Sequence, residues 1–186
     1  MCNDMTLAVG DLAPDVVLCD YEEREVALAS LWQQQVTLLV YVRHFGCPHC
    51  RAHATQLRRT KRKFDALGTQ IVLVGMGTPV KADVFRAELD LPFLVLCDPD
   101  RVGYRRYGLL KMSARHEFAH LSSATRFIAD SARYGVRLAP VGQDFTQLGG
   151  DFVVDTQGIV RFAFCGQRAS DLPEISDLLA ASKAAR

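Results

Sequence analysis

The feature that most constrains the fold is an apolar run that leads directly into two closely spaced cysteines. Val36–Val42 reads VTLLVYV, which is too short to span a membrane and is rich in β-branched residues, so it predicts a buried strand. A short loop, Arg43–Gly46, follows, and Cys47–Cys50 (CPHC) opens a helix-forming segment that continues to about Leu67. A strand that runs through a CxxC turn into a helix is typical of thiol-redox proteins.

The position of Cys47 at the start of this helix gives its thiol a reason to be reactive. With Cys47 as the N-cap, Pro48 falls at the first helical position, where its missing N–H costs nothing. The free N–H groups and the positive end of the helix dipole favour the thiolate of Cys47. Arg43, His44 and His49 add positive or protonatable neighbours, and we expect them to stabilise the thiolate.

Cys50 lies three residues further on, close enough to attack a sulfur on Cys47 and close a disulfide. Helical spacing places Cys50 on the inward stripe of the helix, so we expect Cys47 to be the exposed nucleophile and Cys50 its buried partner. Arg51 adds a further positive charge, and no carboxylate occurs between Glu25 and Asp65 to raise the pKa of the thiol. The spacing could also supply half of a zinc site, but the chain has no second CxxC, so no metal is expected here.

Composition predicts one domain, residues 1–186, and argues against two classes of partner. The chain has 186 residues, 49% of them hydrophobic, which suits a single core. Its net charge of +1 gives no overall attraction to nucleic acid or to an anionic membrane, and we interpret the basic cluster Arg58–Lys63 as a solvated helix face. No apolar stretch approaches the ~18 residues of a spanning helix, so no membrane is expected.

The cysteines and the N-terminus indicate a reducing compartment. The start of the sequence lacks the basic and apolar regions of a secretory signal, so we expect a cytoplasmic protein. The six cysteines are too irregularly spaced for a disulfide-stapled scaffold. Cys19, Cys97 and Cys165 are therefore expected to be small core residues.

The rest of the chain alternates strand-like and helix-like segments, which predicts βαβ units. We expect two further strands, two hairpins and four helices: Gln70–Met76, Pro92–Leu96, the hairpins Val16–Cys19 with Glu25–Leu28 and Asp151–Val154 with Ile159–Phe164, and helices at Ser30–Gln34, Lys81–Leu89, Val102–Tyr107 and Leu172–Ala184. Residues 109–150 are expected to be a helical insertion, with helices at Ser113–His120 and Ser123–Tyr134.

One motif inside that insertion stands apart from the cysteines. His116–His120 spells HExxH, the helix motif of zinc hydrolases, in which both histidines lie on one face. No glycine or third histidine continues the motif, and the only later glutamate is Glu174. An alternating strand and helix pattern of this size is also the wrong context, so we interpret the motif as a coincidence.

Five pieces of the chain, in order, resemble those of a known family: Gly10–Asp15, Arg43–Arg51, Leu91–Asp100, Tyr107–Gly108 and Gly149–Asp155. The chain resembles the peroxiredoxins of thioredoxin fold, and most closely the CxxC-containing branch of AhpC/TSA-like antioxidant proteins. The resemblance implies an α/β, thioredoxin-like fold in which a central mixed sheet is flanked by helices. It also implies an N-terminal hairpin extension and an inserted helical segment at 109–150.

By this resemblance the activity would be thiol-dependent reduction of hydrogen or organic peroxides by Cys47 and Cys50, with no cofactor. One cysteine is oxidised to sulfenic acid, the other resolves it to a disulfide, and an external thiol such as thioredoxin, glutaredoxin or glutathione reduces that bond. Ordinary members have Thr or Ser where this chain has His44, and an Arg that Leu148–Gly149 lacks. Arg43 and Arg168 are the candidates to replace that Arg.

Two other functions remain open at this point. CPHC also matches strongly oxidising disulfide exchange proteins, in which the middle His, here His49, helps to stabilise the thiolate, so the substrate could be a protein or small-molecule disulfide. A redox-regulated binding module, in which the cysteine pair switches a surface for a partner, is the third reading. The sequence leaves open the reductant, the oligomeric state, with a homodimer among the options, and which cysteine meets the substrate.

Overall fold

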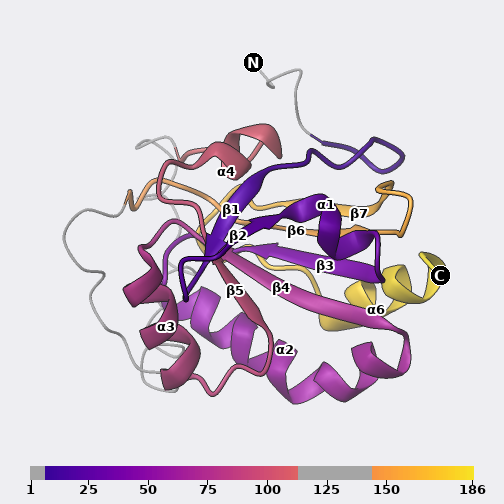
Figure 1. Ribbon diagram of the computed structural model, residues 1–186, viewed down its shortest axis with the longest axis horizontal. Coiled ribbons are helices and arrows are strands. Elements are labelled where there is room, and N and C mark those ends of the chain that lie inside the picture. The colour runs from indigo at the N-terminus through magenta and orange to yellow at the C-terminus, as the bar shows by residue number, and fades with distance from the viewer. Residues whose placement is uncertain (1–6, 113–143) are drawn as a thin grey trace.

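The structure is a computed structural model that describes residues 7–112 and 144–186. Within these ranges the chain forms one seven-stranded sheet with helices on both faces (Figure 1). The strands are β1 (Val17–Asp20), β2 (Glu25–Ala27), β3 (Val36–Tyr41), β4 (Thr69–Gly75), β5 (Leu94–Cys97), β6 (Gly150–Val154) and β7 (Val160–Cys165). The helices are α1 (Leu28–Trp32), α2 (Pro48–Ala66), α3 (Pro79–Glu88), α4 (Val102–Arg106) and α6 (Ile175–Ala184).

The sheet is mixed, as predicted. Its strand order is β2-β1-β5-β4-β3-β6-β7, with β3, β4 and β5 parallel and every other neighbouring pair antiparallel. The parallel strands at the centre follow from the βα units, because a helix must carry the chain back before the next parallel strand. The predicted α/β architecture of a central mixed sheet flanked by helices is confirmed.

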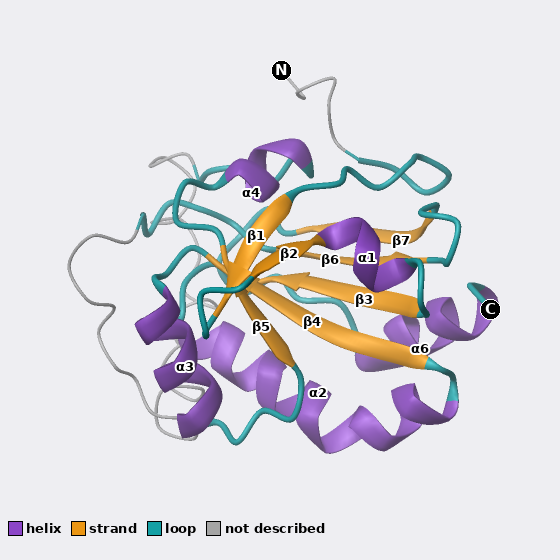
Figure 2. Ribbon diagram, viewed as in Figure 1, coloured by secondary structure: helices purple, strands orange, loops and turns teal. Residues whose placement is uncertain are grey.

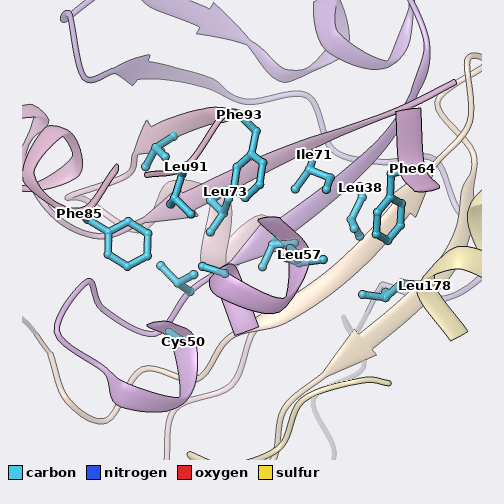
Figure 3. Close-up of a cluster of buried hydrophobic side chains, with 14 of the residues drawn as sticks. Leu38, Cys50, Leu57, Phe64, Ile71, Leu73, Phe85, Leu91, Phe93 and Leu178 are labelled. Carbon is cyan, nitrogen blue, oxygen red and sulfur yellow. The ribbon is translucent and has the colours of Figure 1, made fainter. Parts of the chain in front are cut away.

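The central strand β3 is buried on both faces, which explains its unbroken apolar sequence. Leu38 and Val40 point into the core under α2, α3 and α6, while Leu39 and Tyr41 point into the core under α1 and α4. Figure 2 shows these two groups of helices on opposite sides of the sheet. In Figure 3 Cys50 lies at one end of the core under α2, α3 and α6, so the start of α2 is anchored in that core.

Two buried polar groups fix the region just before the cysteines. The Tyr104 hydroxyl donates to the carbonyls of Val42 (2.5 Å) and Val74 (3.2 Å), and so ties the ends of β3 and β4 together. The Asp98 carboxylate accepts the N–H groups of Val102 and Gly103, both at 2.8 Å, which holds the first turn of α4 under those ends. The CxxC loop therefore leaves the sheet from a rigid base.

Several helix boundaries differ from the prediction by up to three residues, and α3 begins at Pro79 rather than Lys81. The first helix begins at Leu28, two residues before the predicted start, and α6 begins at Ile175 rather than Leu172. The reason for the later start is the Asp171 carboxylate, which accepts the N–H groups of Gln167 and Arg168 and stabilises a turn there instead. Among the described residues, no helix is both long and apolar enough to cross a bilayer.

Part of the predicted insertion lies outside the described residues, including both of its expected helices and the HExxH motif at His116–His120. The two ends of the undescribed stretch lie side by side. Lys111 and Gln147 form an isolated antiparallel bridge, and the Met112 N–H donates to the Thr146 carbonyl at 2.7 Å. The segment therefore leaves and rejoins the domain at one place, beside the cysteines.

Candidate active site

The predicted position of Cys47 as the N-cap of α2 is confirmed. Its backbone is extended (φ −71°, ψ 121°), Pro48 begins the helix, and the Cys47 N–H donates to the His44 carbonyl at 3.0 Å. The Cys50 sulfur accepts the N–H of Arg43 at 3.3 Å, so it faces the end of β3. The described cysteines are all free thiols.

The expected contrast in exposure between the two cysteines is wrong, because both are buried. Cys47 is 1% exposed and Cys50 is 5% exposed. The prediction considered only the face of α2 on which each residue lies. Contacts outside α2 contribute to the burial of Cys47, since the Arg43 side chain contacts its sulfur and is itself held by the carbonyls of Phe145 and Gln147.

Arg43 is the residue that connects Cys47 to that distant segment. Its Nη1 lies 3.8 Å from the Cys47 sulfur, while Nε donates to the Gln147 carbonyl at 3.1 Å and Nη2 to the Phe145 carbonyl at 2.7 Å. Arg43 is 8% exposed, so these carbonyls replace the water that its guanidinium loses. Arg43 is therefore a fixed positive charge beside the sulfur.

The surroundings split the acidities of the two thiols. A hydrogen bond from Cys50 lowers the pKa of Cys47 to about 6, and the Arg43 charge and His49 assist it against the opposing effect of burial. The pKa of Cys50 is raised well above its usual range by its hydrogen bond to Cys47 and by burial. At pH 7 the pair therefore carries a thiolate on Cys47 and a proton on Cys50.

The two predicted histidines differ in what they contribute. Burial, with the Arg43 charge, lowers the pKa of His44 to about 4, so the ring is neutral at pH 7 and the expected positive charge is absent. Its ring packs edge-on against Phe145, with centroids 5.2 Å apart. His49 is buried beside Cys47 and helps to lower the pKa of that thiol.

Arg51 has a carboxylate partner that the sequence did not predict. Its Nη2 lies 3.1 Å from Oε2 of Glu88, which comes from α3, and its guanidinium lies over the Phe85 ring at 5.9 Å from the centroid. The stretch between Glu25 and Asp65 contains no carboxylate, but the fold brings the Glu88 carboxylate next to it. Arg43, rather than Arg51, is the arginine that contacts Cys47.

A buried histidine–aspartate pair next to Cys50 was missed. His53 Nε2 lies 2.8 Å from Asp151 Oδ1, and each residue is 2% exposed. Within the described part of the chain, His53 Nδ1 is buried and has no hydrogen-bond partner. The available signal was spacing, since His53 lies three positions after Cys50 on α2 and so shares its face.

A small cavity joins this pair to Cys50. Its volume is about 20 Å³, and its walls include Arg43, Cys50, His53, Asp151 and Arg168. That is room for one water molecule with several polar partners. Both arginines that the sequence offered as replacements line this cavity, and of the two it is Arg43 that contacts the Cys47 sulfur.

The site contains no obvious cage for a metal ion. In residues 7–112 and 144–186, no group of three or more His, Cys, Asp or Glu side chains is placed to hold one. The arrangement instead offers a thiolate, a protonated thiol next to it, a fixed cation and a buried imidazole. These groups suit the transfer of two electrons and two protons between a dithiol and a disulfide.

Comparisons with known proteins place the chain among thiol-redox proteins. The sequence profile of the AhpC/TSA family matches residues 9–163. The Thioredoxin-like protein AAED1, chloroplastic, of Arabidopsis thaliana is 31% identical over 94 residues, which are 50% of this chain and 38% of that protein. Prostamide/prostaglandin F synthase of Danio rerio is 27% identical over 161 residues, 82% of this chain and 77% of that protein. The chain thus matches well under two thirds of the Arabidopsis protein and most of the Danio one.

Solved structures share the fold. Peroxidoxin BcpB from Mycobacterium tuberculosis superposes with a TM-score of 0.68 at 18% identity, over 97% of this chain and 99% of that one. A putative thiol:disulfide interchange protein DsbE from Chlorobium tepidum gives a TM-score of 0.64 at 23% identity, over 95% and 99%. Peroxiredoxins and disulfide exchange proteins thus share this thioredoxin-like fold, which confirms the predicted fold class.

Proposed function

The chain belongs to the AhpC/TSA family and is a thiol oxidoreductase, and on this premise we propose that it is a thiol-dependent peroxidase for hydrogen or organic peroxides. The observation that carries the proposal is the Arg43 guanidinium 3.8 Å from the sulfur of Cys47, a thiol whose pKa is lowered to about 6. A thiolate at neutral pH is the nucleophile that peroxide reduction needs, and a fixed cation beside it stabilises the leaving alkoxide or hydroxide.

The first step uses Cys47 and Arg43. The thiolate attacks one peroxide oxygen, the O–O bond breaks, and the products are a sulfenic acid on Cys47 and an alkoxide that takes up a proton to become an alcohol or, from hydrogen peroxide, water. Arg43 donates to the oxygens as charge develops on them, because its other N–H groups are already held by the Phe145 and Gln147 carbonyls and so keep it in place.

The second step uses Cys50, which must lose its proton first. The Cys50 sulfur then attacks the Cys47 sulfur, the S–O bond breaks, and water leaves as the disulfide forms. The buried His53 supports this step, since its Nδ1 is unpartnered within the described residues, its Nε2 contacts Asp151 at 2.8 Å, and a cavity for one water is lined by both His53 and Cys50. We assign His53 as the proton acceptor through that water, and Asp151 as the group that orients it.

An external thiol completes the cycle by reducing the disulfide. Thioredoxin, glutaredoxin and glutathione are the candidates, and both cysteines are buried, so the reductant must displace part of the segment around Phe145 to reach Cys47. We propose a cytoplasmic location, where such reductants are present. A homodimer is compatible with this cycle, which needs residues of one chain alone.

The second candidate is thiol–disulfide exchange with little reaction toward peroxide. It is favoured by His44, which is neutral and stands where ordinary peroxiredoxins have a hydroxyl that would hydrogen-bond the peroxide. The Cys47 thiolate would then attack a substrate disulfide, and Cys50 would release the mixed disulfide. The relative named prostamide/prostaglandin F synthase indicates a further option, a lipid substrate.

The test mixes fully reduced protein with hydrogen peroxide, stops the reaction with an alkylating agent at set times, and measures the product by intact and peptide mass. Fast, near-stoichiometric formation of a Cys47–Cys50 disulfide supports the peroxidase. Oxidation little faster than that of a free thiol contradicts it. The same experiment with a small-molecule disulfide in place of peroxide then decides whether exchange is the faster reaction.

A further inference from the structure

A second pair of cysteines lies across two strands, away from α2. In the antiparallel ladder between β1 and β5, Cys19 is directly opposite Cys97 and Asp20 is opposite Leu96. Directly opposite residues project to the same face of a sheet, with Cα atoms about 4.5 to 5.5 Å apart. Disulfides need Cα atoms about 4.4 to 6.8 Å apart, so this register meets that requirement without movement of the strands.

The two thiols of this pair are close and unequally accessible. The Cys19 sulfur lies 4.0 Å from the Cys97 carbonyl oxygen. Cys19 is partly exposed, whereas Cys97 is 1% exposed. Burial raises the pKa of Cys97 to about 12, and the neighbouring Cys19 thiol and Asp20 add to the shift. An external reagent can therefore reach Cys19, while Cys97 reacts through Cys19.

We propose that Cys19 and Cys97 form a second, reversible disulfide, in which Cys19 is the sulfur that meets the oxidant. The oxidant is a low-molecular-weight disulfide, RSSR. The Cys19 thiolate attacks one of its sulfurs, forms a mixed disulfide and releases RS⁻. Cys97 loses its proton to solvent and attacks the Cys19 sulfur, and a second RS⁻ leaves. Two electrons pass from the protein dithiol to RSSR, and the two protons that it loses convert RS⁻ to two RSH.

The bond would fix a weakly held part of the sheet. Strand β1 contacts β5 over only two paired positions, yet it carries β2 and the whole N-terminal hairpin. The bond also encloses the stretch between residues 19 and 97, which contains the active-site helix α2. A cross-link over so long a stretch restricts the unfolded chain, so we expect the midpoint of thermal unfolding to rise by roughly 5 to 15 °C.

The experiment removes the active-site thiols, so its result does not depend on the proposed peroxidase. The triple variant Cys2→Ser/Cys47→Ser/Cys50→Ser keeps three of the six cysteines. Reduced variant is incubated with glutathione disulfide, stopped with N-ethylmaleimide and measured by intact mass. We expect a transient glutathione adduct on Cys19, then loss of two hydrogen atoms and a tryptic cross-link between peptides 1–24 and 87–101. The thermal midpoint should rise with the same time course and fall again with dithiothreitol.

Two additions to that variant serve as matched controls. Cys97→Ser should stop the reaction at the Cys19 adduct, whereas Cys165→Ser should leave the cross-link unchanged, because Cys165 lies on β7 at the other edge of the sheet. An adduct on Cys19 that never converts, a cross-link to Cys165, or reaction only in denaturant would each overturn the proposal. The wild-type chain, oxidised in the same way and fragmented to place the bond on Cys19, guards against a variant that fails to fold.

Discussion

The Cys47–Cys50 pair and the Cys19–Cys97 pair lie in the same hydrophobic core, on one side of the sheet. The pKa values of one thiol from each pair, Cys47 and Cys97, are nevertheless shifted in opposite directions. The pKa of Cys47 is lowered to about 6, while that of Cys97 is raised to about 12. Both thiols are 1% exposed, so burial does not separate them. The difference lies in what each sulfur contacts. Cys47 has a helix N-terminus, an arginine and a donating thiol, whereas Cys97 has a strand, a thiol and a carboxylate nearby.

This comparison indicates what turns a buried cysteine into a nucleophile. Removal of a thiolate from water is unfavourable, and burial alone therefore raises the pKa, as it does at Cys97. At Cys47 the Arg43 charge and the Cys50 hydrogen bond more than offset that cost. The first pair is thus prepared to react at neutral pH, and the second reacts only when its exposed member, Cys19, attacks an oxidant.

The largest expected effect is on peroxide consumption, which should depend on the Cys47–Cys50 pair and not on the Cys19–Cys97 pair. Cys47→Ser should reduce peroxide consumption by about a thousandfold or more, because the nucleophile is lost, whereas Cys97→Ser should change it by less than about twofold. Steady-state peroxide consumption with a thiol reductant measures both. Cys50→Ser should trap a sulfenic acid or mixed disulfide on Cys47, seen by mass. Trapping on Cys50 in Cys47→Ser would instead reverse the two roles.

The next effect tests whether Arg43 accounts for the difference in acidity. Arg43→Gln should raise the pKa of Cys47 and slow its reaction at pH 7 by about 10- to 100-fold, because the nearby cation is lost. The rate of alkylation of Cys47 against pH, with its midpoint near 6 in the wild type, measures the shift. Arg51→Gln is the matched control, since Arg51 pairs with Glu88, and it should move the midpoint little. Equal shifts in both variants would remove Arg43 from its assigned role.

The third effect concerns the proton of Cys50. His53→Gln should slow closure of the Cys47–Cys50 disulfide at least about tenfold, and leave the first oxidation of Cys47 unchanged. Quenched-flow samples would show sulfenic acid that accumulates in the variant, with a closure rate that now rises with hydroxide concentration. Thr55→Val, a buried change on the same helix, is the control for altered packing. A pH-independent loss in both variants would assign His53 a packing role only.

The sequence predicted the framework of this comparison and missed the contacts that distinguish the pairs. The strand β3, the CxxC turn and the helix α2 were predictable because their signals depend only on nearby residues. These signals are an apolar run, a proline in the first helical turn and a glycine after the helix. The burial of Cys47 was not predictable, since Arg43, which contacts its sulfur, is held by the carbonyls of Phe145 and Gln147, about a hundred residues away. The neutral state of His44 was missed because it follows from the burial of the ring in the fold, with the Arg43 charge beside it. The predicted insertion at 109–150 remains a prediction.

The Cys19–Cys97 juxtaposition could not have been read from the sequence either. Both residues were predicted to be small core cysteines. The prediction placed Cys19 in its strand and Cys97 one residue after its strand, which is close to the observed β1 and β5. Their pairing requires the strand order, in which β1 joins the edge of β5 with a particular register. Strand order and register are set by the whole sheet, and a single residue's neighbours along the chain carry no information about them.

The smallest expected effect is on stability, and it gives the two pairs opposite dependence on pH. The unfolded thiol has a pKa of about 8.5. Because the folded pKa of Cys97 is higher, the stability that it contributes is complete below about pH 8.5 and is lost as the pH rises toward 12. Because the folded pKa of Cys47 is lower, its contribution is complete above about pH 8.5 and is lost as the pH falls toward 6.

Urea unfolding of the reduced protein at a series of pH values measures how the free energy of unfolding changes with pH on each side. From pH 8 to 9.5, Cys97→Ser should lose about 1 kcal/mol less stability than the wild type, while from pH 8 to 6.5 Cys47→Ser should lose less than the wild type. Tyrosines titrate in all three proteins, so the difference between wild type and Cys97→Ser isolates Cys97, whereas Cys47→Ser reports the coupled Cys47–Cys50 pair. Parallel curves for wild type and Cys97→Ser would mean that Cys97 is no harder to ionise in the fold than in the unfolded chain, and the contrast between the pairs would then rest on Cys47 alone.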